Sequence, residues 1–503
     1  MKGTMNRRQL MKAAGASVAG LAASRCTVLA ADNASQERKK LNLLFIWTDE
    51  QRADTMAVYG NRNIRVPNMN RLASESVVFK NAYVTQPVCT PNRSAVMTGL
   101  WPHTTGCTTN NIPLPVGIPC LPELLGDADY RTAYMGKWHL GDELFAQHGF
   151  EEWVSMEDGY GSGFSEGRDR NTRSDYHRFL IEHGYQPDSG GKFSRTFAAR
   201  RPIEHCKPKF LELKACDFLR RHRNEPFILY VNFLEPHMPF TGPLDTMYDP
   251  NEIDLPASFN DPLEDNEPEY CKKKLRQCAK SYGTTEQDYR KLIARYWGLN
   301  SQVDRSVGAI LDTLEQLGLA DDTIVVYTSD HGDMMGAHRL VEKGLMYQEA
   351  TRIPWLMRVP AMGHKQRVID QPVSQIDIVP TLLELMGRSQ AAAHLPGQSL
   401  IPVIRGDKAA RDHVFIEWNT EPRIRTVISP DGWKLCLSKE DKCQLFNLRQ
   451  DPGETTNLFD SNLHQDVITR LTGKIYQWQE NDGDTKKCVL GPKNDIYTVS
   501  IRA

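Results

Sequence analysis

The chain has 503 residues and a formal net charge of −2, with 40% hydrophobic and 25% charged residues. This composition is typical of a globular protein with a large core, and the length allows two to four domains at about 150 residues each. The nearly balanced charge gives no support for nucleic-acid binding, so an anionic ligand would have to meet a local cluster of cations.

The N-terminal segment has the features of a targeting signal. Arg7 and Arg8 precede an Ala- and Gly-rich stretch, and small or apolar residues up to Ala30 offer a cleavage site. The pattern resembles a bacterial twin-arginine signal, which predicts a signal peptide over residues 1–30, recognition by the twin-arginine export machinery, and a periplasmic or secreted protein. Arg25 interrupts the apolar run, so a membrane-spanning helix is not expected here. The alternative is a cytoplasmic protein with a basic, Ala-rich tail.

Strand and helix patterns then alternate over a large domain, residues 41–405. Short apolar runs predict buried strands over 41–47, 77–84, 130–135, 227–233 and 323–328. Helices are predicted over 66–76, 121–128, 210–222, 287–317 and 376–386. This alternation predicts an α/β fold in which a mostly parallel sheet is covered by helices on both faces.

The remaining segments are more polar or change in pattern. Residues 150–208, rich in Gly, Ser, Asp and Arg, are predicted to form a loop-heavy insertion over the site, and residues 245–282 a second polar insertion. Residues 406–503 are predicted to form a smaller C-terminal subdomain with an antiparallel sheet and a covering helix. Its elements are expected over 414–418, 424–429, 433–437, 445–448 and, for the helix, about 463–480.

The stretch Cys89-Thr90-Pro91-Asn92-Arg93 has the pattern C-x-P-x-R. Pro91 suits the first turn of a helix, and Cys89 would lie just before that helix, near the positive end of its dipole. Such a position lowers a thiol pKa and favours an anionic ligand. Arg93 adds a permanent charge and a planar fork of donors. Taken alone, such a cysteine would more often be a buried or semi-buried residue at a helix start.

Charged residues follow several of the predicted strands. Because the carboxyl ends of parallel strands share one edge of a sheet, Asp49 and Glu50 are expected to meet Asp330 and His331. Oxygen ligands of this kind suit a hard divalent cation such as Ca²⁺ or Mg²⁺. Each acidic residue alone would more often be a helix cap or a turn residue, and only their combination favours a metal.

Basic residues occupy the ends of other strands and a later loop. Lys137 and His139 lie in Gly-Lys-Trp-His, His237 follows a strand, and Lys343 lies in a loop after Asp330. With Arg93 they can donate to the oxygens of a sulfuryl or phosphoryl group. Lys343 by itself would be a solvated surface lysine.

These motifs occur in the order seen in the sulfatase family, which the chain resembles from about residue 42 to its C-terminus. The matching elements are the acidic strand end, C-x-P-x-R, G-K-W-H, P-H after a strand, and D-H-G followed by K-G. A turn at Asp451-Pro452-Gly453-Glu454 matches the family's C-terminal domain. The resemblance implies an alkaline-phosphatase-like fold and hydrolysis of sulfuric esters. Since the similarity is to exported bacterial polysaccharide sulfatases, it also implies a sulfated saccharide as substrate.

The resemblance implies that a formylglycine-generating enzyme oxidises Cys89 to formylglycine, whose hydrated aldehyde is the nucleophile. The implied metal ligands, for Ca²⁺ or Mg²⁺, are Asp49, Glu50, Cys89, Asp330 and His331. The implied catalytic residues are Cys89, Arg93, His139 and His237, and the implied substrate-binding residues are Lys137, His237 and Lys343. Glu50 and His331 depart from the family pattern, where Asp and Asn are common.

Two other functions fit parts of the pattern. A phosphonate or phosphate ester hydrolase on the same fold would use the same cluster of cations. A non-catalytic glycan-binding protein would retain Cys89 as a thiol. Residues near the motifs that could line a sugar pocket, or be structural, are Arg52, His103, Asn110, Arg168, His338 and Arg339.

Eleven cysteines are present, including Cys26 in the predicted signal and Cys89 in the motif. The other nine are an odd number, so at least one is expected to stay unpaired. No C-x-x-C pair exists, which gives little support for a structural zinc site. The spacing suggests one disulfide between Cys436 and Cys443 across a hairpin and another between Cys271 and Cys278 in a loop.

Overall fold

In the computed structural model of this protein, residues 40–407 and 409–486 are described. Every element named below lies within residues 41–486. The signal peptide predicted over residues 1–30 lies outside the described residues and stays a prediction. Within the described ranges, no helix has both the length and the apolar character needed to cross a membrane.

A nine-stranded sheet forms the centre of the described residues, in the order β4-β3-β5-β1-β6-β7-β2-β8, with β9 paired to β2. In that order the strands span Glu152–Val154, Arg131–Gly136, Phe227–Pro236, Asn42–Asp49, Thr323–Ser329, Arg352–Arg358, Val77–Tyr83, Arg367–Ile369 and Val373–Ser374. The strands β4, β3, β5, β1 and β6 are parallel to one another, whereas β7 is antiparallel to β6 and β2. The predicted mostly parallel sheet is therefore confirmed.

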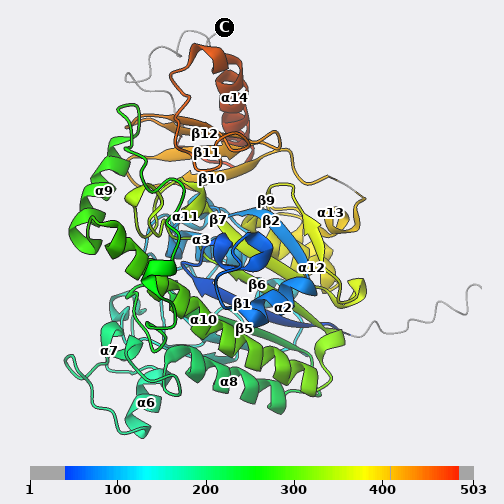
Figure 1. Ribbon diagram of the computed structural model, residues 1–503. Coiled ribbons are helices and arrows are strands. Elements are labelled where there is room, and N and C mark those ends of the chain that lie inside the picture. Colours follow the sequence, from blue (N-terminus) through cyan, green and yellow to red (C-terminus); the bar gives the residue numbers. More distant parts are fainter. Residues whose placement is uncertain (1–39, 408, 487–503) are drawn as a thin grey trace, which may run out of the picture. The chain divides into compact units, whose positions relative to one another are not determined.

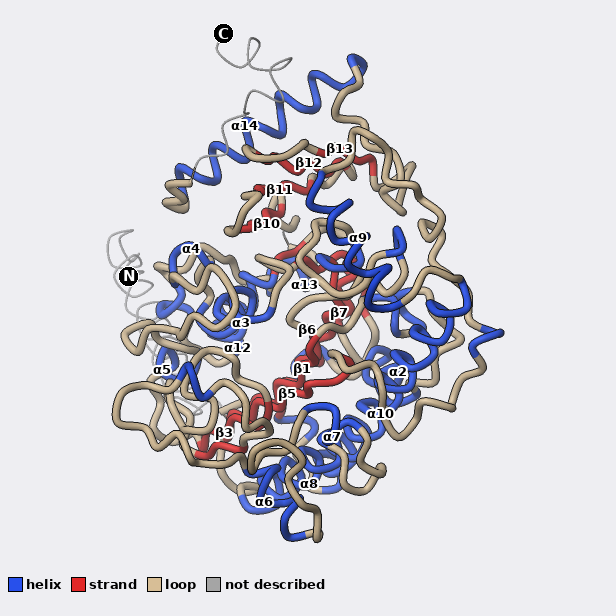
Figure 2. The backbone as a smooth tube through the Cα atoms, turned by 90° about the vertical axis from the view of Figure 1, so that its left-hand side faces the viewer, coloured by secondary structure: helices blue, strands red, loops and turns tan. Residues whose placement is uncertain are grey.

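The side chains of β1 alternate between two cores on opposite faces of this sheet. Leu44 and Ile46 pack with α2, α8 and α10, while Leu43 and Phe45 pack with α3, α5 and α12. These helices span Pro67–Ser74, Lys207–Arg221, Glu286–Gln316, Cys89–Thr98, Leu121–Leu125 and Ile378–Leu385. Figure 2 shows α2, α8 and α10 on one side of the strands and α3, α5 and α12 on the other. The prediction of helices on both faces is thus confirmed.

The long helix α10 agrees with the prediction of a helix over residues 287–317. It begins after Thr285, whose side chain accepts a hydrogen bond from the backbone N–H of Asp288 and so caps the helix. Its predicted core face is buried at Tyr296, Val303 and Ile310. The apolar residues recur at helical spacing over a stretch long enough to predict the helix, despite the polar residues between them.

Both polar insertions contain helices that their composition did not reveal. Within residues 150–208 lie α6 (Asp175–Glu182) and α7 (Arg195–Ala199), capped by Ser174 and Ser194. The rest of this segment is mostly loop, as predicted, and each serine marks the point where a loop ends and a short helix begins. The second insertion ends in α9 (Glu269–Tyr282), a lysine-rich helix with only Cys271 and Cys278 fully buried on it.

The predicted antiparallel sheet near the C-terminus is confirmed (Figure 1). Its strands β10 to β13 span Val414–Trp418, Ile424–Ile428, Trp433–Ser438 and Gln444–Asn447, and they pair in chain order. Helix α14 (Gln465–Asn481) covers one face, where Ile468 and Leu471 pack against Val427 and Leu435. The division of the chain at residue 405 stays a prediction.

Neither predicted disulfide is formed. Cys271 and Cys278 lie on the same helix, so their Cα atoms are about 10 Å apart, too far for a disulfide. Cys436 lies opposite Gln444 in the sheet and packs into a different core from Cys443. All nine cysteines in the described part of the chain are free thiols.

Candidate active site

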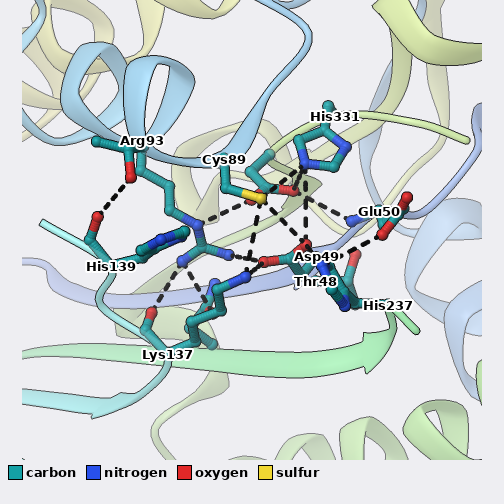
Figure 3. Close-up of polar contacts among 12 residues, drawn as sticks. Thr48, Asp49, Glu50, Cys89, Arg93, Lys137, His139, His237 and His331 are labelled. Carbon is teal, nitrogen blue, oxygen red and sulfur yellow. Dashed lines mark hydrogen bonds and ion pairs between the residues drawn. The ribbon is translucent and has the colours of Figure 1, made fainter. Parts of the chain in front are cut away.

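The carboxyl ends of four parallel strands meet at one edge of the main sheet, where β1 lies between β5 and β6. In open α/β sheets this is the edge where ligands bind. The residues at these strand ends are Asp49 with Glu50, Lys137, His237, and Asp330 with His331. The start of α3 brings Cys89 to the same place (Figure 3).

Cys89 is the first residue of α3. The helix therefore starts two residues before Pro91, and Cys89 lies inside its first turn instead of just before it, still at the positive end of the dipole. Its Sγ lies 3.2 Å from His331 Nε2 and 3.8 Å from Asp49 Oδ1. Burial and Asp49 raise the pKa of the thiol, but nearby cations, led by Lys137, hold it well below its usual range.

Arg93, one turn further along α3, joins two carboxylates. Its Nη2 donates to Asp49 Oδ2 at 2.6 Å and its Nε to Asp330 Oδ2 at 2.8 Å, and all three side chains are fully buried. Its Nη1 donates to the backbone oxygen of Lys137 at 2.8 Å and to Asn232 Oδ1 at 3.1 Å. Because these bonds occupy the guanidinium, its geometry suits positioning of the two carboxylates.

The turn after β3 aims Lys137 at Asp49. Gly136 has a φ of 115°, and a Cβ there would lie 1.9 Å from the backbone oxygen of Asn232, so only glycine permits this turn. Lys137 Nζ lies 2.5 Å from Asp49 Oδ2. Burial lowers the pKa of Lys137, but Asp49 and Cys89 together leave the pKa above its ordinary value. The site thus contains a charged ammonium 3.8 Å from Cys89 Sγ.

His139 lies beside the same cavity as Cys89. Its backbone N–H donates to Glu143 Oε2 at 2.6 Å, and its backbone oxygen accepts from Thr90 Oγ1 at 2.8 Å, which fixes its unusual φ of 60°. Its Nε2 pairs with Asn111 Oδ1 at 2.8 Å. Burial lowers the pKa of this imidazole, so it is neutral near pH 7 and able to accept a proton.

His237 and Lys343 form a second pair of donors. Lys343 Nζ lies 2.9 Å from His237 Nε2 and 2.7 Å from Glu50 Oε2. Nδ1 of His237 lies 2.8 Å from the backbone oxygen of Met238, so it carries the proton and Nε2 accepts from the ammonium. Burial and Lys343 lower the pKa of His237. The pair therefore holds a charged lysine next to a neutral histidine.

Several buried acceptor atoms at this edge have no protein donor. Glu50 Oε1 and Asp333 Oδ2 are buried without a hydrogen-bond partner among the described residues, and burial raises the pKa of Glu50 to about 7. Ligand atoms of four buried residues lie within 4.8 Å of one another, namely those of Asp49, Cys89, Asp330 and His331. Arg93 and Lys137 bond to the Oδ2 atoms of the two aspartates and leave their Oδ1 atoms facing the site. Together with the partnerless Oε1 of Glu50, these carboxylate oxygens fit a hard divalent cation.

His331 is oriented for this role by its neighbour. Its Nδ1 lies 2.9 Å from the backbone oxygen of Gly332, which leaves Nε2 facing Cys89 and Asp49. Asp333, which was not predicted as a site residue, accepts hydrogen bonds through Oδ1 from the N–H groups of Met335 and Glu342. Its position as a second acidic residue soon after the β6 strand was its signal in the sequence.

All ten predicted site residues lie in this one cluster, and their roles stay predictions. Of the six further residues named as possible pocket residues, Asn110 lines the cavity at Cys89. The other five lie elsewhere; Arg52, for example, pairs with Asp54, His103 with Glu417 and His338 with Asp261.

A cavity of about 570 Å³ opens above Cys89 and extends along the insertion of residues 150–208. On the Cys89 side it is lined by Lys137, His139, His237 and Lys343, and on the far side by Glu157, Asp158, Tyr160, His177, Lys192, Arg195 and Lys207. The ring of Tyr160 lies 4.5 Å from the ring of His139 and joins the two sides. The predicted position of the insertion over the site is therefore correct, although its individual residues were not predicted.

Glu157 holds two cations in the far wall. Its carboxylate accepts two hydrogen bonds from Arg195, at 2.8 and 2.7 Å, and one from Lys207 at 2.7 Å. Burial raises the pKa of Glu157, but the two cations outweigh it and hold the pKa well below its usual range. The ionised carboxylate therefore contributes stability above pH about 4.3, which is lost as the pH falls toward the folded-state pKa.

Replacing Glu157 with Gln is expected to lower the free energy of unfolding at pH 7 by about 3 kcal/mol, because it leaves buried cations unpaired. Urea unfolding at pH 7 and pH 4 should show a smaller loss of stability on acidification in Glu157→Gln than in the wild type. Glu182→Gln, an exposed glutamate at the end of α6, is the matched control and should behave as the wild type. An unchanged pH dependence in Glu157→Gln would contradict the assignment.

Comparison with known proteins agrees with this geometry. The model of the sulfatase family matches residues 41–388, and that of the N-sulphoglucosamine sulphohydrolase C-terminal region matches residues 336–481. The chain is 30% identical over 460 residues to uncharacterized sulfatase YidJ of Escherichia coli, covering 89% of this chain and 88% of that protein. It is 26% identical over 527 residues to an N-acetylglucosamine-6-O-sulfatase of Bacteroides thetaiotaomicron, covering 90% of each.

Solved structures share the fold. A protein in complex with its substrate D-glucosamine-2-N,6-O-disulfate superposes with a TM-score of 0.73 at 23% identity, covering 89% of this chain and 99% of that one. A phosphonate monoester hydrolase from Silicibacter pomeroyi gives a TM-score of 0.75 at 22% identity, covering 89% and 96%. These likenesses confirm the predicted alkaline-phosphatase-like fold. Because the family model spans most of the chain, and the strand ends meet around Cys89, the chain belongs to the sulfatase family and is a hydrolase of sulfuric esters.

Proposed function

We propose that this sulfatase removes sulfate from a sulfated saccharide, using Cys89 converted to formylglycine together with a bound divalent cation. The observation that carries the proposal is the position of Cys89 Sγ, buried at the base of the cavity between Asp49, Lys137 and His331. A saccharide is supported by the relative that acts on N-acetylglucosamine sulfate and by the volume of the cavity beyond the site.

The two absent groups would each supply one kind of chemistry. The hydrated aldehyde at position 89 would be the nucleophile toward sulfur. A Ca²⁺ or Mg²⁺ ion held by Asp49, Glu50, Asp330, His331 and residue 89 would act as a Lewis acid toward a sulfuryl oxygen.

The side chains of the chain itself then have distinct duties. Lys137 and Lys343 present ammonium groups toward the place where sulfate would lie, and such preorganised donors stabilise charge that develops on the sulfuryl oxygens. Arg93 holds the carboxylates of Asp49 and Asp330 in fixed relative positions by bonding to both. It acts through them, since four of its five N–H donors are bonded to protein acceptors.

Proton transfer is assigned to the histidines. His139, neutral because of burial, accepts a proton from the nucleophile at position 89. His237 and Lys343 share a hydrogen bond of 2.9 Å, so a proton given to the leaving alcohol from this pair can be replaced within it. Figure 3 shows His237 on the opposite side of the site from His139, as separate acid and base require.

Maturation and export are inferred from the sequence. A formylglycine-generating enzyme would act on the Cys89 motif, and the twin-arginine machinery would carry the chain to the periplasm or beyond. Both inferences rest on residues 7–30 and on Cys89-Thr90-Pro91-Asn92-Arg93.

Rates on matched esters would test the function. The purified enzyme should release sulfate from sulfated sugars much faster than phosphate or phosphonate from the corresponding esters, and the peptide containing Cys89 should have the mass of an aldehyde. Faster hydrolysis of the phosphonate ester would favour the phosphonate hydrolase instead, since the same cations bind both groups. A peptide mass of an unmodified thiol in fully active enzyme would refute the formylglycine assignment.

Removal of divalent cations with EDTA is expected to abolish activity and lower the melting temperature. Ca²⁺ or Mg²⁺ added back at a hundred times its Kd should stabilise the folded protein by about 2.7 kcal/mol, because it binds only the folded state. Calorimetry with each ion separately would show which is preferred. The same addition should leave Asp330→Asn nearly unchanged, and an equal response in that variant would exclude this cluster as the cation site.

A further inference from the structure

The far wall of the cavity is not used by the proposed reaction. A space of about 570 Å³ is much larger than a sulfate group, so most of it holds the molecule to which the sulfate is attached. Five lysine or arginine side chains line the cavity, compared with only two carboxylates, although the net charge of the chain is −2. Basic side chains therefore outnumber acidic ones among the residues that line the cavity.

The two carboxylates of this wall are occupied by protein donors. Glu157, 7% exposed, is bonded to Arg195 and Lys207. Asp158, 2% exposed, accepts from the N–H and Oγ of Ser174 at 2.8 and 2.9 Å, and lies 2.5 Å from His177 Nδ1. The charge of Glu157 is thus offset by two cations, and both oxygens of Asp158 already have protein partners in Ser174 and His177.

The basic groups, in contrast, keep donors for a ligand. The side chain of Arg195 is 31% exposed, and its Nη1 donates no hydrogen bond to the rest of the described chain. Lys192, three positions earlier, lines the cavity, and its ammonium forms no ion pair within residues 40–407 and 409–486. His177, held through Nδ1, leaves Nε2 for a sugar hydroxyl.

Arg195 is also held in place relative to the reacting end. Its Nη2 donates to the hydroxyl of Tyr160 at 2.8 Å, and the Tyr160 ring packs on His139. Because Nε and Nη2 donate to Glu157, the N–H groups of Nη1 have a defined position. A fixed guanidinium is suited to a planar carboxylate or to a sulfate.

We propose that Lys192 and Arg195 form a second anion subsite, which binds another negatively charged group of the same saccharide while the reacting sulfate lies at Cys89. The substrate class is then a saccharide with at least two anionic groups, the second being a carboxylate or a sulfate. This inference rests on the proposed function and specifies its substrate.

Matched pairs of sulfated glucosamine and galactosamine sugars test the subsite. The members of each pair share the reacting sulfate and differ only in a second anionic group, which is a sulfate in one series and a linked uronate in the other. The wild type is expected to hydrolyse the doubly anionic member with a kcat/KM about 10- to 100-fold higher, the effect of one or two charge-assisted hydrogen bonds. A preference in only one series identifies the second group as sulfate or carboxylate.

The variants Lys192→Gln and Arg195→Gln are expected to reduce this preference by about tenfold each. Lys192 has no ion pair to lose, so its variant remains informative if Arg195→Gln fails to fold. Arg200→Gln, an exposed arginine at the end of α7 that does not line the cavity, should retain the full preference.

Equal rates on both members of every pair in the wild type would overturn the subsite, as would an unchanged preference in Lys192→Gln and Arg195→Gln. In either case measurable desulfation of the singly charged sugars would leave the proposed function standing. If no sulfated sugar in any series is hydrolysed, the saccharide sulfatase proposal itself fails.

Discussion

Replacing Cys89 with Ala is expected to reduce kcat for sulfate esters by about 10⁴-fold or more, as removal of a nucleophile does in other hydrolases. Cys89 lies at the base of the cavity, and its side chain is the only one in the C-x-P-x-R motif that lines it. The contacts of its Sγ are with His331, Asp49 and Lys137. Helix α3 stays anchored without them, through the bonds of Arg93 to Asp49 and Asp330. The folded structure should therefore survive the change, with a loss of stability within about 1 kcal/mol.

Cys107→Ala provides the matched control. Cys107 is also fully buried, but it packs in the core between α3 and α5 and does not line the cavity. This variant should lose some stability and keep its kcat. Steady-state rates and urea unfolding of both variants would separate the two effects, and turnover at the wild-type rate in Cys89→Ala would refute the nucleophile.

The positions of the charged residues at the strand ends were predictable because two simple rules act together. Buried parallel strands such as 41–47 and 323–328 are continuous apolar runs, and a charged residue can appear only where such a run ends. Asp49 and Asp330 mark these ends, and the shared direction of the strands brings them to one edge. The sequence therefore predicted which residues meet, although not the bonds that Arg93 makes to both.

Strand β7 was not predicted, because a proline interrupts its sequence. The sequence from Arg352 to Arg358 contains Pro354, which cannot donate to a sheet and argues against a central strand. In the structure the β6 ladder reaches only Trp355, and the register of β2 shifts between Phe79 and Ala82, opposite Pro354. Irregular pairing with both neighbouring strands, β6 and β2, thus accommodates the missing N–H of Pro354. No pattern in the local sequence predicts this irregular pairing.

The far wall of the cavity was unpredictable for a different reason. Glu157, Tyr160 and Arg195 are scattered through a segment of turn-forming residues, where periodicity carries no signal. Their arrangement depends on long-range ion pairs and on two short helices that start at serines. Composition could place this segment over the site, but it could not say which of its side chains face the substrate.

Arg93→Met is expected to impair both stability and catalysis. Arg93 is fully buried and compensates two buried carboxylates, Asp49 and Asp330, so its removal should lower the free energy of unfolding by about 3–5 kcal/mol. The freed carboxylates would also move apart, which displaces the ligand atoms at the site and should lower kcat by about 100-fold or more. Arg93→Lys keeps the charge but cannot bond both carboxylates in the same way, so an intermediate loss is expected.

Arg425→Met distinguishes the two effects. Arg425 is equally buried and bonds Asp484 at 2.6 and 3.1 Å, but it lies in the C-terminal sheet. Its variant should lose a similar amount of stability in urea and retain the kcat of the folded fraction. If Arg93→Met and Arg425→Met lose stability alike while only the former loses kcat, the guanidinium of Arg93 acts by holding Asp49 and Asp330 in register. An unchanged kcat in folded Arg93→Met would show instead that these carboxylates keep their positions without it.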